Sequence, residues 1–133
     1  MAKLHMLTYC ESTDVNNNKT IINNPLMSLN LKYIPGIFSF SISVGIIDVD
    51  LEKTHTFRAV VKNSMTGEEV MSTPEFKVDG TDKDSKLPKE LRGIILNVGF
   101  MNAEFTEEGQ YITEVIFDGV NIGGNPIQVI EVE

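Results

Sequence analysis

The strongest constraint on the fold of this chain is a strict alternation of apolar and small residues between positions 38 and 46. One parity holds Phe38, Phe40, Ile42, Val44 and Ile46, and the other holds Ser39, Ser41, Ser43 and Gly45. Successive side chains of a β-strand point to opposite faces of a sheet, whereas a helix would scatter these residues around its circumference. The segment is therefore predicted to be a strand with one apolar face, in the middle of a sheet.

The same period of two recurs along most of the chain, between turn signals rich in Gly, Pro, Asn and Asp. Strand-like segments fall at 4–8, 20–22, 29–31, 54–62, 69–73, 76–78, 94–100, 111–117 and 127–132. Residues 12–18 have the composition of a turn, and 87–93 that of a single helical turn. The pattern predicts an all-β fold, an antiparallel sandwich of seven to nine strands forming one domain over residues 1–133.

Composition excludes several classes of partner. The chain has 133 residues, a normal size for one domain, and 19 acidic against 11 basic residues give a formal net charge of −8. This charge repels a phosphate backbone, so we expect no nucleic-acid partner and no anionic membrane surface. Cys10 is the only cysteine, so no disulfide forms within the chain, and the N-terminal residues lack a signal peptide. We therefore expect a cytoplasmic protein.

The final third of the chain carries a specific structural signal. Glu107, Gly109 and Tyr111 place an acidic residue, a glycine and a tyrosine at every second position before a strand. This spacing is typical of a tyrosine corner, in which the tyrosine that opens a late strand bonds back to the preceding chain. The Tyr111 hydroxyl is expected to bond a backbone group between positions 103 and 108.

The same third resembles filamin-type and other intracellular immunoglobulin-like repeats. Those repeats carry a Gly-x-Tyr strand, a Gly turn and a closing Pro-hydrophobic-x-Val strand, matched here by Gly109, Tyr111, Gly119, Pro126, Ile127 and Val129. The alternating middle looks like small uncharacterised bacterial or phage proteins of the same sandwich type. The resemblance implies an immunoglobulin-like sandwich with a role in binding or scaffolding, and it supplies no catalytic residue.

Two acidic groups and two histidines are candidate metal ligands. Asp48, Asp50 and Glu52 alternate like the oxygen ligands of a calcium site, and a second acidic group comprises Asp79, Asp82 and Asp84. Both groups fall at predicted turns, where Asp is favoured for its backbone hydrogen bonds. His5 and His55 would need Cys10 and scattered carboxylates to complete a zinc site, and no spacing supports one. We expect no metal, no cofactor and no catalytic site.

Two surfaces remain as candidates for binding. The small side chains of Ser39, Ser41 and Ser43 would let another protein approach closely, which makes this face a candidate protein-binding surface. Exposed edge strands offer a second mode, in which an extended peptide joins the sheet, and the edges near Pro74 or at 127–132 are the expected places. The leading hypothesis is a non-enzymatic intracellular binding or accessory module. A structural subunit of a larger assembly, such as a phage virion or secretion component, is the alternative, and a homo-oligomer stays open.

Overall fold

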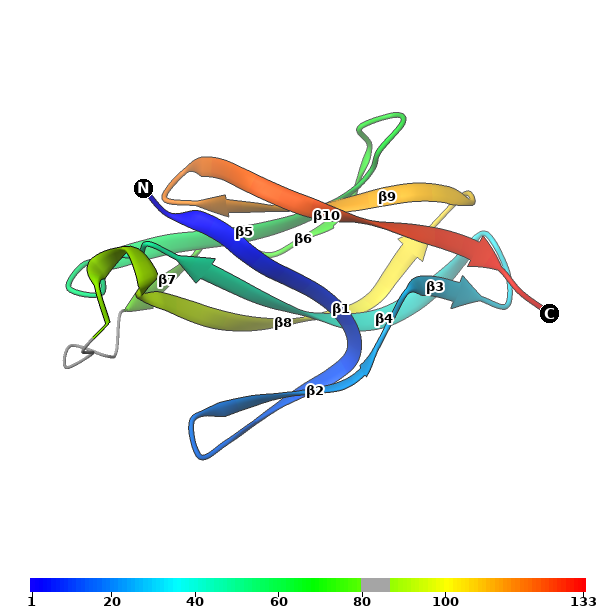
Figure 1. Cartoon of the computed structure of the whole chain (residues 1–133). Coiled ribbons are helices and arrows are strands. Elements are labelled where there is room, and N and C mark those ends of the chain that lie inside the picture. Colours follow the sequence, from blue (N-terminus) through cyan, green and yellow to red (C-terminus); the bar gives the residue numbers. More distant parts are fainter. Residues whose placement is uncertain (80–86) are drawn as a thin grey trace.

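The computed structural model describes residues 1–79 and 87–133, and it is built almost wholly of β-strands (Figure 1). In chain order the elements are β1 (Lys3–Asn16), β2 (Lys19–Pro25), β3 (Ser28–Leu31), β4 (Gly36–Ile47), β5 (Thr54–Asn63), β6 (Glu69–Ser72), β7 (Phe76–Asp79), the short 3-10 helix η1 (Lys89–Leu91), β8 (Gly93–Phe105), β9 (Gly109–Phe117) and β10 (Val120–Glu131). The prediction of an all-β sandwich is confirmed.

Two sheets form the sandwich. The four-stranded sheet has the order β2-β1-β4-β8, and the six-stranded sheet has the order β3-β10-β9-β5-β6, with β7 also paired to β5. β4 lies between β1 and β8, so the alternating segment is central, as its pattern predicts. Its apolar parity is buried between the sheets: Phe40, Ile42, Val44 and Ile46 are each at most 2% exposed.

The strand count and one strand direction differ from the prediction. The described part of the chain holds ten strands, one more than the upper bound of the prediction, and β6 and β7 on either side of Pro74 both pair with β5. β3 runs parallel to the end of β10, while the other pairs are antiparallel. Periodicity identifies a strand but carries no information about the direction of its neighbour, so the sequence could not show this parallel pair.

The first hairpin is also longer than its composition suggests. Instead of a turn over residues 12–18, β1 continues to Asn16, and the chain reverses at Asn17 and Asn18, whose φ angles are 52° and 61°. Asn tolerates this left-handed conformation, which two-residue hairpin turns require. The first half of β1 pairs with β4 and the second half with β2. Residues 11–24 therefore form a two-stranded extension, here called the β1–β2 arm, which projects below the sandwich in Figure 1.

A polar bridge joins the two sheets on the side where β1 meets β10. The Tyr9 hydroxyl in β1 donates to the carbonyl oxygen of Asn125 and lies 2.8 Å from the hydroxyl oxygen of Thr113. The Asn125 amide returns a hydrogen bond of 3.0 Å to the Leu7 carbonyl oxygen. Tyr9 is 4% exposed and Thr113 is fully buried, and burial raises the pKa of Tyr9 to about 12. These bonds close one side of the sandwich.

Removal of the Tyr9 hydroxyl tests how much this bridge contributes. Tyr9→Phe keeps the ring but removes the partner of the buried Thr113 hydroxyl and of the Asn125 carbonyl oxygen, and a buried polar group left unsatisfied costs roughly 1–3 kcal/mol. We expect the free energy of unfolding, measured by urea denaturation, to fall by this amount with an unchanged far-ultraviolet circular dichroism spectrum. A free energy equal to that of the wild type would show that the bridge adds nothing.

Candidate functional site

The opposite side of the sandwich, where β8 lies next to β6 and β7, is open. β8 ends the four-stranded sheet, and no other strand of the described chain continues that sheet beyond it. Its residues 93–103 include no charged side chain and no proline. Natural edge strands are usually protected by charges, prolines or bulges, because their unpaired backbone groups attract other strands. β8 has two such devices, both in its second half: the charge of Glu104 and a bulge in which Met101 and Asn102 together oppose one residue of β4.

A groove of about 830 Å³ runs along the start of this edge. Its floor is the β8 segment from Gly93 to Asn97, and its walls come from Val78 and Asp79 of β7 and from the tip of the β1–β2 arm. Val15 on the arm is 67% exposed and Ile95 on β8 is 54% exposed, so two large apolar side chains face solvent here. The groove combines strand backbone that is unpaired on its outer side with walls that are part apolar and part polar.

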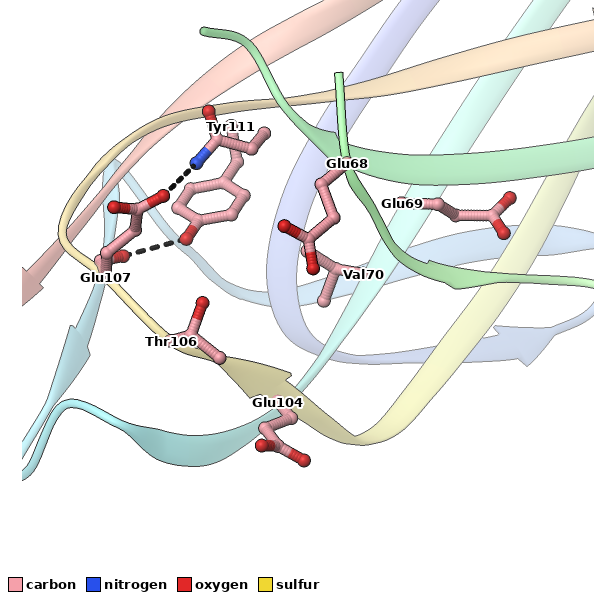
Figure 2. Close-up of a pocket in the computed structure, with 8 residues that line it drawn as sticks. Glu68, Glu69, Val70, Glu104, Thr106, Glu107 and Tyr111 are labelled. Atoms are coloured by element: carbon pink, nitrogen blue, oxygen red, sulfur yellow. Dashed lines mark hydrogen bonds between the residues drawn. The ribbon is translucent and has the colours of Figure 1, made fainter. Parts of the chain in front are cut away.

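An acidic cleft of about 260 Å³ lies at the other end of the open side (Figure 2). Its lining includes four carboxylates, which come from Glu68 just before β6, Glu69 of β6, Glu104 of β8 and Glu107 of the following loop. Two of them have partners: Glu69 forms an ion pair with Arg58 at 3.2 Å, and Glu107 accepts a hydrogen bond from the Asn63 amide. The cleft therefore has a negative electrostatic potential and suits a cationic group.

The tyrosine corner forms one wall of this cleft. The Tyr111 hydroxyl donates to the carbonyl oxygen of Glu107 at 2.7 Å, and Gly109 has a φ of 141°, which suits glycine. The ring is 1% exposed and packs edge-on against Phe105 at 5.0 Å. Burial raises the pKa of Tyr111 despite its hydrogen bonds to Asn63 and Glu107. The corner fixes the loop that carries Glu107, as Figure 2 shows.

The serine face is only partly accessible. Ser39 is exposed, Ser41 is half-buried and Ser43 is fully buried, so the Ser43 side chain offers no exposed surface to a partner. Ser43 lies in register between Thr8 of β1 and Asn97 of β8, whose larger side chains flank it on the same face. Ser39 and Ser41 stay a predicted binding surface, although the Ser39 Oγ already accepts a hydrogen bond from the Asn102 backbone N–H.

One of the two edges expected to bind a peptide is occupied. Residues 127–131 belong to β10, which pairs with β9 on one side and with β3 on the other. Pro74 does lie at the edge of the six-stranded sheet, between the short strands β6 and β7. The long edge β8 was missed, because the sequence does not show which strand ends a sheet. The lack of charge over residues 93–103 was the available signal.

The first acidic group weighed for calcium serves local structure. Asp48 pairs with the amino group of Met1 at 2.8 Å, and this hydrogen bond lowers the pKa of Asp48. Asp50 accepts a hydrogen bond from the Glu52 backbone N–H, so these residues form a turn and not a strand face. In the second group, Asp79 accepts a hydrogen bond from Thr54, and positions 82 and 84 lie outside the described residues.

The ligands weighed for zinc are also placed by the structure. His5 lies exposed on β1, whereas Cys10 is buried with its Sγ 3.6 Å from the Ser41 carbonyl oxygen. Burial raises the pKa of the Cys10 thiol. Among residues 1–79 and 87–133, no three His, Cys, Asp or Glu side chains are placed to hold a metal ion.

His55 is buried at the start of β5. Its Nδ1 lies 2.6 Å from a carboxylate oxygen of Asp118, and its Nε2 lies 2.7 Å from the Asp50 carbonyl oxygen. The ring stacks on Phe117 with centroids 5.0 Å apart. Burial by itself lowers the pKa of His55, but the bonds to Asp50 and Asp118 outweigh it and raise the pKa above the ordinary value of 6.5. Both ring nitrogens face acceptors, which favours the doubly protonated imidazolium.

Comparison with protein families identifies one match. Residues 5–130 match the model of a family of unknown function, DUF6941, and the chain belongs to this family. A search of curated proteins finds no match.

Comparison with solved structures gives two matches of low sequence identity. A structure of the alkylpurine DNA glycosylase AlkC of Pseudomonas fluorescens, bound to DNA containing an abasic site analog, is similar over 96% of this chain, with 12% identity and a TM-score of 0.54. The chain spans only 30% of that glycosylase chain, and the similarity shows the fold alone. An immunoglobulin-like protein of Pseudomonas aeruginosa aligns over 98% of this chain and 97% of its own, with 13% identity and a TM-score of 0.37.

In the described part of the chain, no helix has the length and apolar character that a membrane crossing requires.

The His55 contacts predict a defined pH dependence of stability. Because the folded pKa is raised, the stabilising contribution is fully present below the unfolded pKa of about 6.5 and is lost as the pH rises through the folded value. His55→Gln removes the titration. We therefore expect the difference in denaturation midpoint between wild type and variant to be largest below pH 6.5 and to shrink at higher pH. A difference that is the same from acid to alkaline pH would contradict this account.

Proposed function

We propose that this protein is a non-enzymatic binding or accessory module that holds a protein partner on the open side of its sandwich. The observation that carries the proposal is the groove of about 830 Å³ along the start of β8, on the side of the strand that does not pair with β4. A concave surface lined by exposed apolar side chains and unpaired backbone can hold a segment of polypeptide through main-chain hydrogen bonds.

The titratable groups with shifted pKa values support a binding role over a catalytic one. Tyr9 bonds Thr113 and Asn125 between the sheets, and His55 bonds Asp50 and Asp118 between two loops. Each of these groups is buried and its hydrogen-bonding atoms are engaged with the protein itself. Their pKa shifts therefore follow from contacts that hold the fold together.

The net charge supports a protein partner over a nucleic acid. The glycosylase structure of similar fold is bound to DNA, but the present chain has a net charge of −8 and a cleft lined by four glutamates on its open side. Both features repel phosphates, so we propose a neutral or basic protein as the partner.

The alternative, a structural subunit of a larger assembly of bacterial or phage origin, rests on the same edge. An edge strand with no charged residue or proline over positions 93–103 can also join copies of one chain. Self-association at micromolar concentration that requires β8 would favour the subunit role. The cytoplasmic location remains part of the proposal, supported by a sandwich that contains a single buried cysteine and no intrachain disulfide.

Site-specific photo-crosslinking in cells that produce the protein tests where the partner binds. A photoreactive amino acid replaces Ile95 in the groove or, as a control, Val120 at the end of the β9–β10 hairpin; these side chains are 54% and 44% exposed. We expect a discrete conjugate with another protein at position 95 and none at position 120. Equal conjugates at both positions, or none at position 95, would overturn the proposed function.

A further inference from the structure

We infer that the partner contributes an extended strand that pairs with β8 in the groove and carries basic residues at the end that reaches the acidic cleft. This inference rests on the proposed function and states the chemistry of the partner segment.

The groove has the features that strand addition requires. Its floor is the start of an edge strand, so the backbone N–H and C=O groups on the outer side of β8 have no strand to pair with in the described chain. Val15 of the arm and Ile95 of β8 supply apolar contacts for alternate side chains of an added strand. Main-chain hydrogen bonds would provide the affinity, and these contacts would favour a strand with alternating apolar residues.

A second, independent observation lies at the floor of the groove. The side-chain oxygen of Asn97, which lines the groove, is buried without a hydrogen-bond partner, and so is the Oγ of Ser43 opposite it in register. Ser43 is fully buried. Buried polar atoms are nearly always hydrogen-bonded in native structures, so the unpaired oxygen of Asn97 in the lining of the groove indicates a place where a donor from a ligand is expected.

The acidic cleft determines the charge of the inferred segment. Asn97 and Glu104 both lie on β8, seven residues apart, which corresponds to about 23 Å of extended chain. An added strand that pairs with β8 in the groove and continues beside it therefore reaches the cleft about seven residues beyond Asn97. Glu68 and Glu104 have no ion pair within the described residues, and lysine or arginine side chains would neutralise them.

A second copy of this chain fits the surface less well than a basic partner. Two β8 edges could pair, but residues 93–103 of the added copy bring no positive charge to the glutamates of the cleft. Two molecules of net charge −8 would also repel each other on approach. The electrostatics favour a basic segment from another protein.

Two synthetic peptides serve as probes, Lys-Lys-Lys-Thr-Val-Thr-Val-Thr-Val and the same residues in reverse order, so that both strand directions are tested. Binding is measured by fluorescence anisotropy at low salt. The peptide that binds is then N-methylated either on its three threonines or on its three valines. An added strand uses the amide N–H groups of one parity only, so we expect one methylated form to lose at least about tenfold in affinity and the other to bind nearly as the parent.

The charge of the cleft is tested with the double variant Glu68→Gln, Glu104→Gln. A matched control, Glu52→Gln with Glu133→Gln, removes the same charge from exposed positions elsewhere. We expect the first pair to weaken binding of the lysine-containing peptide at least about threefold, with a smaller dependence on salt, and the control pair to leave binding close to wild type.

Several outcomes would overturn the inference. These are failure of both peptides to bind, equal loss for the two methylated forms, equal effects of the two glutamate pairs, or a homodimer that forms through β8 at the concentrations used. The proposed function would survive each of the first three if position 95 still crosslinks to a partner, because the groove would then hold a segment of other chemistry. Loss of that crosslink would instead remove the proposed function itself.

Discussion

The hydrogen bonds of Tyr9 are the interaction on which the arrangement of the two sheets depends. They tie β1 of one sheet to β9 and β10 of the other through Thr113 and Asn125, and the Tyr9 and Thr113 side chains are buried. A buried hydroxyl must keep its partners, so this bridge fixes both the separation and the relative position of the sheets at that side. β1 meets β10 there, and the opposite side, at β8, has no matching connection between the sheets among the described hydrogen bonds.

The open side follows from this asymmetry. β8 lies next to β6 and β7 without continuing their sheet, so its outer backbone groups face the groove at one end, while the acidic cleft lies at the other. The tyrosine corner at Tyr111 holds the rim of the cleft, and the β1–β2 arm supplies a wall of the groove. The fold thus places a long edge strand between a groove that exposes the apolar side chains of Val15 and Ile95 and a set of carboxylates, which is the basis of the proposed binding role.

The sequence predicted the parts of this account that depend on local pattern. Alternation at 38–46 correctly identified a central strand with one buried face, and the Glu-x-Gly-x-Tyr spacing indicated the bond that Tyr111 makes. Local sequence patterns could not predict features that depend on which strands become neighbours. The burial of Ser43 comes from Thr8 and Asn97 on adjacent strands, and the burial of His55 comes from partners 5 and 63 positions away. The composition predicts a turn over residues 12–18 of the β1–β2 arm, because the polar strand there buries neither face and so shows no alternation of apolar and polar residues.

Residue-resolved hydrogen exchange of the isolated protein tests the central claim most directly. If β8 is an open edge, its amides from 94 to 100 should alternate between slow and fast exchange, because every second N–H bonds to β4 and the others face solvent. The amides of Gln128 and Val129 in β10, which pair with both β9 and β3, should both be slow. Uniform protection along β8 would contradict the account, since it would show that this edge is already covered in the free protein.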